Sequence, residues 1–157
     1  MINKDFVRRK ISLIQDELSH LVELSRFSLN EIVGDFVKMS ALERILERII
    51  SRAIDINNHI IAELASMNTS PPKDYRETFM RMAELNVYPE DFAKQISKSI
   101  GTRNVLIHEY DKVVAATIYN SVSDCLRDYH KYCEYISDFI NLLKDEQLTN
   151  SKTSISM

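Results

Sequence analysis

The segment Gly-Thr-Arg-Asn-Val-Leu-Ile-His-Glu-Tyr-Asp, residues 101–111, places several chemically active side chains close together. Arg103 carries a permanent positive charge on a planar guanidinium that can bind two phosphate oxygens at once. His108 has an unperturbed pKa of about 6.5, so it can accept and donate a proton at neutral pH. RNA cleavage without a metal needs a base for the 2′-hydroxyl, an acid for the leaving 5′-oxygen and a cation for the phosphorane. The segment therefore contains residue types suited to phosphodiester chemistry.

The spacing of these residues limits how they can meet if the segment is helical. Asn104 and His108 are four residues apart and share one face, whereas Arg103 and Tyr110 share another. On an ideal helix Arg103 and His108 lie about 140° apart. They reach one substrate only if the helix bends or if two chains contribute. A two-fold dimer would supply two histidines and two arginines to one cleft, as the reaction requires.

The elements that position this segment are predicted to be long helices. The chain has 157 residues but only 2 Gly and 3 Pro, far below the average usage of roughly 7% and 5%. Strand-rich domains need many turn residues. Gly34 and Gly101 are too far apart for a phosphate-binding P-loop, and two glycines cannot supply the three of a dinucleotide-binding GxGxxG motif. We therefore predict an all-α bundle of four or five mostly antiparallel helices.

Apolar periodicity and capping residues divide the chain into these helices. Ser40 with Glu43, and Asp74 with Glu77, resemble capping boxes, Pro89 suits a first turn, and Asp111 is a predicted N-cap. The expected helices are 4–27, 40–65, 75–86, a short one from 89 to about 100, and 112–144.

One domain is expected over residues 1–144, followed by a polar, disordered tail at 145–157. The longest apolar run has four residues, Val113 to Ala116, which is too short for a membrane span. The polar start of the chain has no export signal, so we expect a cytoplasmic protein without membrane association. Cys125 and Cys133 lie about 12 Å apart along one predicted helix, and we expect them to be reduced and packed.

Outside the segment, several polar and aromatic side chains have both structural and functional interpretations. With 20 basic and 23 acidic residues, the net charge is −3 and gives no general attraction to RNA. Lys94 and Lys98 precede the segment by one and two turns and are candidate RNA contacts. The stripe of Arg44, Arg48 and Arg52 could follow an RNA backbone, but a solvated face balanced by Glu43 and Glu47 is favoured. Packing or solvation is the expected role of the remaining histidines and the clustered tyrosines, namely His20, His59, His130, Tyr129, Tyr132 and Tyr135.

Gly101 lies two residues before Arg103 in a chain that otherwise contains almost no glycine. We expect its missing Cβ to permit a close backbone approach, or a local bend that brings Arg103 and His108 onto one phosphate.

The pattern of Arg103, four residues, His108, one residue and Tyr110 resembles the R-x4-H-x-Y signature of HepT toxins in the HEPN superfamily. The order of long helices around the signature is similar as well. The resemblance implies a HEPN-type bundle and a homodimeric endoribonuclease that uses no metal or cofactor and leaves 2′,3′-cyclic phosphate ends. It implies catalytic roles for Arg103 and His108 and a supporting role for Asn104.

The resemblance also implies a partner. HepT-like toxins are paired with a minimal nucleotidyltransferase antitoxin, which transfers AMP onto the signature tyrosine, here Tyr110. Added nucleotides would bring negative charge into the cleft where RNA phosphate must bind. The alternative is a non-catalytic helical adaptor that presents a substrate to the nucleotidyltransferase.

Overall fold

A computed structural model describes the backbone of residues 1–107 and 112–155 and the side chains of residues 1–107 and 114–143. This part of the chain contains eight helices and no strand, which confirms the all-α prediction. The helices are α1 Lys4–Leu24, α2 Leu29–Val33, α3 Phe36–Leu64, α4 Tyr75–Glu84, α5 Glu90–Ser97, α6 Ser99–Ile107, α7 Lys112–Asn120 and α8 Val122–Ile155.

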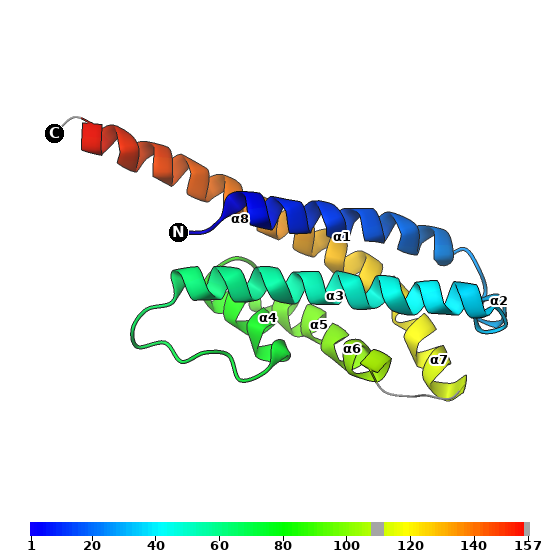
Figure 1. Cartoon of the computed structure of the whole chain (residues 1–157). Helices are drawn as coiled ribbons and strands as arrows, with labels where there is room; N and C mark the ends of the chain where they lie inside the picture. Colours follow the sequence, from blue (N-terminus) through cyan, green and yellow to red (C-terminus); the bar gives the residue numbers. More distant parts are fainter. Residues whose placement is uncertain (108–111, 156–157) are drawn as a thin grey trace.

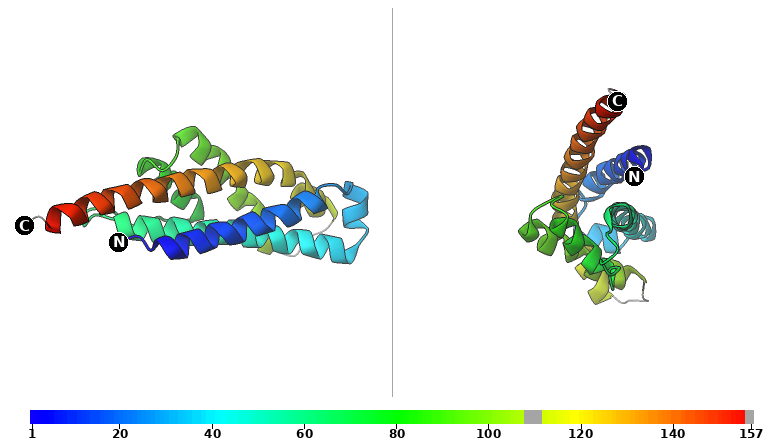
Figure 2. Two further views of the ribbon diagram at one scale, coloured as in Figure 1. Left: turned by 90° about the horizontal axis from the view of Figure 1, so that it is seen from above. Right: turned by 90° about the vertical axis from the view of Figure 1, so that its left-hand side faces the viewer.

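Three long helices, α1, α3 and α8, lie side by side and form the body of the bundle (Figure 1). α1 runs antiparallel to both of the others, as the two further views show (Figure 2). α4, α5 and α6 form a second layer against α3 and α8, and α2 packs on α7 at one end. None of the described helices combines the length and the hydropathy needed to cross a membrane.

The apolar stripe predicted for α1 is its buried face. Val7, Ile11, Ile14 and Leu21 are all buried, facing the neighbouring helices. The side chain of Asn3 accepts a hydrogen bond from the Phe6 amide at 3.0 Å and so caps the first turn. Periodicity therefore located this element and its orientation correctly.

The start of α3 differs from the prediction. Asp35 is the N-cap, and its Oδ1 accepts hydrogen bonds from the amides of Val37 at 2.9 Å and Lys38 at 3.2 Å. Ser40 lies inside the helix, so the capping box predicted at Ser40 and Glu43 is wrong. A carboxylate one turn earlier satisfies the free amides first, and the helix begins there.

The loop that contains Pro71 and Pro72 connects α3 to α4, as the expected helix bounds predicted. The cap of α4 is also at the predicted position. Asp74 accepts a hydrogen bond from the Glu77 amide at 2.8 Å, which confirms it as the N-cap. The Glu77 carboxylate in turn accepts from the Lys73 amide at 2.6 Å. Pro89 occupies the N-cap of α5 rather than its first turn, and Glu90 and Asp91 follow it at the positive end of the helix dipole.

The long last helix is interrupted at Ser121, so the single helix predicted over 112–144 is instead α7 and α8. The Ser121 hydroxyl donates to the Ile118 carbonyl at 2.6 Å, a local bond that competes with regular helix. α8 also continues to Ile155, so the backbone of 145–155 is helical where the sequence predicted a disordered tail. Extending a formed helix is much easier than starting one, and Lys, Glu, Gln and Leu favour extension.

The core contains the residues expected to pack there. Tyr129 and Tyr132 are completely buried, and Tyr135 is half-buried. Cys125 and Cys133 are buried free thiols, as predicted. Burial raises the pKa of each thiol to about 12, so both are neutral at physiological pH.

Candidate active site around Arg103

Arg103 lies near the middle of α6 and is held against α4. Its guanidinium carbon is 4.7 Å from the centroid of the Tyr75 ring, the first residue of α4. The Arg103 Nε is buried and has no hydrogen-bond acceptor among the described residues. A cation over an aromatic ring is attracted by its negative face. This contact fixes the guanidinium in place and leaves a buried donor that an anionic ligand could satisfy.

A buried chain of hydrogen bonds holds the start of α4 in position. The Tyr132 hydroxyl of α8 donates to the Asn57 Oδ1 of α3 at 2.6 Å, and the Asn57 Nδ2 donates to the Thr78 Oγ1 at 3.2 Å. The Thr78 hydroxyl then donates to the Tyr75 carbonyl at 2.7 Å. Asn57 and Tyr132 are completely buried. Three helices therefore determine where Tyr75, and with it Arg103, can lie.

The other predicted site residues are placed as follows. Asn104 is exposed, next to Arg103 on α6. Lys94 is exposed on α5 and pairs with Glu90 at 3.5 Å. Lys98 is exposed at the break between α5 and α6, and lines a small hollow against α8. These lysines therefore have different neighbours from Arg103, which faces α4.

His108, Glu109, Tyr110 and Asp111 lie outside the described residues. Their chain neighbours show where the connection begins and ends: α6 ends at Ile107 and α7 starts at Lys112, and the two helices pack on each other. The predicted cap at Asp111 and the meeting of Arg103 with His108 stay predictions.

Gly101 does not have the close backbone neighbour that the sequence suggested. It is helical, and among the described residues the atom nearest to a Cβ built there is the Arg76 Nη2, at 3.4 Å. That atom is the end of a flexible side chain in ordinary contact. The interruption in the helix falls at Lys98, between α5 and α6.

Sequence reasoning missed the role of Tyr75. Tyr75 is the first residue of the helix expected over 75–86, and no role was predicted for it; Phe79 and Met82 of this helix are completely buried. Tyr75 itself is 43% exposed and contacts Arg103, 28 positions later in the chain. A buried Asn in an otherwise apolar stripe, Asn57, was the available signal, because such a group needs a tertiary hydrogen-bond partner.

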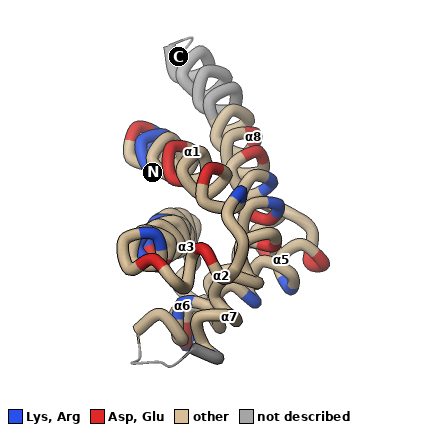
Figure 3. The backbone as a smooth tube through the Cα atoms, turned by 90° about the vertical axis from the view of Figure 1, so that its right-hand side faces the viewer, with Lys and Arg blue, Asp and Glu red and all other residues tan. Residues whose placement is uncertain are grey.

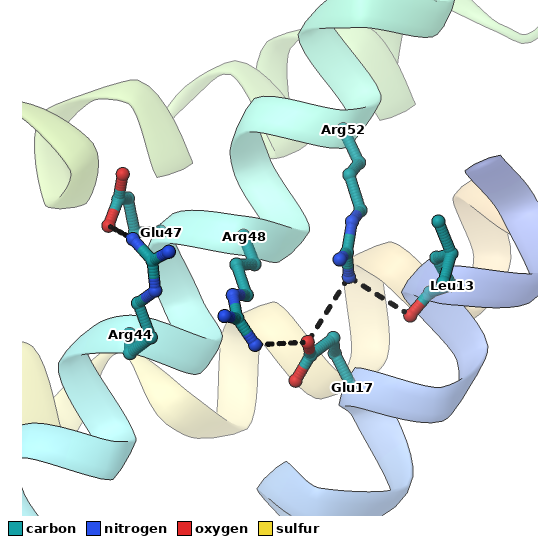
Figure 4. Close-up of polar contacts among 6 residues, drawn as sticks. All are labelled: Leu13, Glu17, Arg44, Glu47, Arg48 and Arg52. Atoms are coloured by element: carbon teal, nitrogen blue, oxygen red, sulfur yellow. Dashed lines mark hydrogen bonds and ion pairs between the residues drawn. The ribbon is translucent and has the colours of Figure 1, made fainter.

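The basic stripe on α3 does not form a uniform solvated face. Arg44 pairs with Glu47 at 3.2 Å, but Arg48 and Arg52 both reach Glu17 of α1, at 3.4 Å and 3.2 Å (Figure 4). Two of the three arginines thus join α1 to α3, and among the described residues Glu43 forms no ion pair with the stripe, in contrast to the balance predicted from the sequence. Basic and acidic residues are interspersed along α1, α3 and α5 (Figure 3).

The histidines outside the segment are structural or solvated, as predicted. His59 accepts a hydrogen bond from the Asn3 amide at 2.9 Å and packs on Phe6. His130 pairs with Glu134 on the surface, and His20 is exposed. The described residues contain no group of three or more His, Cys, Asp or Glu side chains able to hold a metal ion.

The arrangement of helices matches that of two solved proteins, one of which is a HEPN toxin. The tri-AMPylated HEPN toxin of Shewanella oneidensis, solved in complex with an MNT antitoxin, has a TM-score of 0.73 and 22% identity. The match covers 85% of this chain and 98% of that one. YutE of Bacillus subtilis, a cytosolic protein of unknown function, has a TM-score of 0.73 and 14% identity over 90% of this chain and 92% of its own. The fold is therefore of the HEPN class.

The sequence identifies the family within this fold. The family profile Ribonuclease HepT-like matches residues 14–136. The tRNA nuclease HepT of Aphanizomenon flos-aquae is 32% identical over 142 residues, covering 89% of this chain and 93% of that protein. The mRNA nuclease HepT of Shewanella oneidensis is 24% identical over 102 residues, covering 65% and 74%. The chain belongs to the HepT-like ribonuclease family, which confirms the resemblance carried by Arg103, His108 and Tyr110.

Proposed function

We propose that this chain is the toxin of a toxin–antitoxin pair and cleaves RNA as a metal-independent endoribonuclease. The observation that carries the proposal is Arg103, held on α6 by the Tyr75 ring with its buried Nε unpaired among the described residues, five positions before His108. Family membership supports the reaction class, since two relatives are named as a tRNA nuclease and an mRNA nuclease.

The proposed reaction needs no group from outside the protein and its RNA. A His108 imidazole removes the proton of a 2′-hydroxyl, whose oxygen attacks the neighbouring phosphorus. The bond from phosphorus to the 5′-oxygen breaks, a protonated His108 gives that oxygen a proton, and a 2′,3′-cyclic phosphate remains. Arg103 stabilises the charge on the phosphorane, and Asn104 supports the substrate beside it. A homodimer supplies the two histidines in opposite protonation states.

Lys94 and Lys98 are proposed RNA contacts that lie outside the centre of the site. Both are exposed, and each would neutralise one phosphate. Replacing either by Ala should weaken RNA binding for all sequences and lower the salt dependence of binding by about one counterion. An unchanged salt dependence would assign these lysines to the solvated surface.

The proposed partner is a minimal nucleotidyltransferase antitoxin that attaches AMP to Tyr110. The fold relative from Shewanella oneidensis was solved as a tri-AMPylated toxin with an MNT antitoxin. Tyr110 lies two residues after His108, so added phosphates would repel an RNA backbone and bind Arg103. AMPylation would then switch off the nuclease.

RNA cleavage in excess chelator tests the proposed activity. The wild-type protein should cut and leave 2′,3′-cyclic ends, whereas His108→Ala and Arg103→Ala should not. Arg44→Ala is the matched control, because Arg44 is an exposed arginine on another helix and pairs with its neighbour Glu47. Equal activity in the wild type and in His108→Ala would identify a contaminating nuclease and refute the proposal.

The modification is tested with the cognate nucleotidyltransferase and ATP. The chain should gain the mass of one or more AMP groups, and fragmentation should place them on Tyr110. Tyr110→Phe should remain unmodified and stay active in the presence of the antitoxin. An adduct on another residue would refute the assignment of Tyr110.

A non-catalytic adaptor is the second candidate. It is favoured by the net charge of −3 and by the engagement of Arg48 and Arg52 with Glu17, which reduces the positive surface open to RNA. An adaptor should keep its partner binding and its effect on cell growth after Arg103→Ala. Growth arrest that disappears with this substitution would exclude the adaptor.

A further inference from the structure

A groove opens between α3 and the start of α4, and it is linked to Arg103 through Tyr75. Its volume is about 470 Å³, and Tyr75 forms part of its wall. The ring of Tyr75 also contacts the Arg103 guanidinium. Tyr75 is therefore shared between the groove and the candidate phosphate site. The residues that line the groove are Asn58, Pro72, Lys73, Asp74, Tyr75 and Thr78.

The side chains of the groove suit a planar, polar ligand. Tyr75 offers a partly exposed aromatic ring, and stacking on such a ring is available to any nucleobase because every base has a π-face. Asn58 is exposed, and its amide presents a donor and an acceptor in one plane, as base edges do. Lys73 and Asp74 add one positive and one negative charge at the rim. The groove thus combines a stacking surface with hydrogen-bonding groups.

The distance to Arg103 decides between a base and other planar ligands. In an RNA strand a base and its phosphate are joined through one ribose. A phosphate bound by Arg103 would therefore place a neighbouring base close to the Tyr75 ring, 4.7 Å from the guanidinium carbon. Bases become available for such stacking in single-stranded loops and ends, where they are not paired.

We propose that this groove is a nucleobase subsite for the nucleotide next to the scissile phosphate, with Tyr75 stacking on the base and Asn58 reading its edge. This inference rests on the proposed ribonuclease function, which it deepens by adding a specificity-determining residue. Tyr75 then has two roles, as a positioning residue for Arg103 and as a stacking surface. Asn58 has only the second, because it reads the base and does not hold the arginine.

The first experiment measures binding without cleavage. The probe is a single-stranded oligoribonucleotide with a 2′-deoxy sugar at the cleavage position and 2-aminopurine as the neighbouring base. The wild-type protein should quench its fluorescence. Tyr75→Leu should abolish the quenching and weaken binding about fivefold or more, whereas Tyr75→Phe should retain both. Phe36→Leu is the matched control, because Phe36 is an exposed aromatic residue that lies about 33 Å from Asn58 along α3.

The second experiment measures base preference in cleavage. Oligoribonucleotides that differ only in the base next to the cleavage position are compared for KM and kcat. The wild type should prefer some bases, and Asn58→Ala should lose this preference through KM while kcat for the preferred substrate changes little. Circular dichroism should show that Tyr75→Leu and Asn58→Ala keep the wild-type helix content.

The outcomes separate the subsite from the nuclease itself. Tyr75-dependent quenching by a protein that cuts no RNA would support the subsite and refute the proposed function. Normal cleavage with base preference and quenching unchanged in Asn58→Ala and Tyr75→Leu would overturn the subsite alone. Uniform loss of cleavage in Tyr75→Leu with quenching retained would restrict Tyr75 to positioning Arg103. Protection of residues 72–78 from hydrogen exchange by the antitoxin but not by the probe would assign the groove to a protein partner and also overturn the subsite.

Discussion

Alanine substitution of the three arginines on α3 should have very unequal effects on stability, although the residues share one type and one four-residue spacing. Arg52 is the most enclosed, with its side chain 20% exposed, and it donates to both the Glu17 Oε1 and the Leu13 carbonyl. Arg48 reaches the same Glu17 atom but is 45% exposed. Arg44 is 60% exposed and pairs with Glu47 within α3. The order of destabilisation should follow this order of enclosure.

The magnitudes follow from burial and from the number of bonds lost. Breaking a fully buried ion pair costs about 3–5 kcal/mol, so replacing the partly buried Arg52 by Ala should lower the free energy of unfolding by about 2–3 kcal/mol. The Arg48 pair is partly buried through Glu17, but Arg48 itself is half-exposed, so the pair should contribute about 1 kcal/mol, the upper value for exposed pairs. An i,i+3 pair such as Arg44 with Glu47 contributes at most about 0.5 kcal/mol. For a chain of this length 1 kcal/mol shifts Tm by about 2–4 °C. Arg52→Ala should therefore lower Tm by roughly 4–12 °C and Arg44→Ala by about 2 °C or less.

Thermal and urea unfolding followed by circular dichroism measures these changes. A double-mutant cycle that combines Glu17→Ala with Arg52→Ala should show a coupling well above the error of additivity, about 0.3–0.5 kcal/mol. The reasoning is refuted if Arg44→Ala costs as much as Arg52→Ala, or if the effects of Glu17→Ala and Arg52→Ala are additive. Unchanged stability with weakened RNA binding in Arg48→Ala would instead show that the stripe follows an RNA backbone.

Three further predictions test the core and α6. Asn57→Leu leaves the buried Tyr132 hydroxyl and the buried Thr78 hydroxyl without their amide partner. The urea midpoint should therefore fall by the equivalent of about 1–3 kcal/mol. An unchanged midpoint would show that the chain of hydrogen bonds contributes nothing to stability. Cys125 and Cys133 should react with a thiol reagent at pH 8 only after unfolding, and rapid labelling of the native protein would contradict their burial. Because burial raises each folded-state pKa from 9.0 to about 12, their contribution to stability should be complete below pH 9 and decline as the pH rises towards 12. Gly101→Ala should raise the free energy of unfolding by about 0.5–1 kcal/mol, since the position is helical and its neighbour is a flexible side-chain end; a lower Tm would show a close approach after all.

The elements that the sequence predicted well are those whose signal is local and repeated. The apolar stripe of α1 recurs every three or four residues, and each member adds to the same orientation. The cap at Asp74 was also predictable, because a Pro-Pro pair ends the preceding segment and leaves few positions for the start of α4. Repeated apolar spacing and helix-breaking prolines are therefore enough to divide this chain into its main helices.

The errors occurred where two local signals compete and the sequence does not show which is stronger. Asp35 and Ser40 are both acceptable N-caps, and the choice depends on whether the preceding residues are already helical. Ser121 lies in an apolar pattern that continues on both sides, yet its hydroxyl bonds to the Ile118 carbonyl and α7 ends there. Periodicity reports which face is buried, and it does not report whether the backbone is continuous.

The candidate site shows the same limit at the level of chemistry. Arg103, His108 and Tyr110 lie within eight residues, so a sequence motif can predict them as candidate site residues. Tyr75 reaches Arg103 because the fold brings the first residue of α4 to the middle of α6, and no sequence spacing predicts this contact. Asn57, a buried residue of α3, is linked through the Thr78 hydroxyl to the Tyr75 carbonyl, and the ring of Tyr75 contacts Arg103. If that chain of hydrogen bonds sets the position of the Tyr75 ring, then Asn57→Leu should impair RNA cleavage beyond the fraction of protein it unfolds.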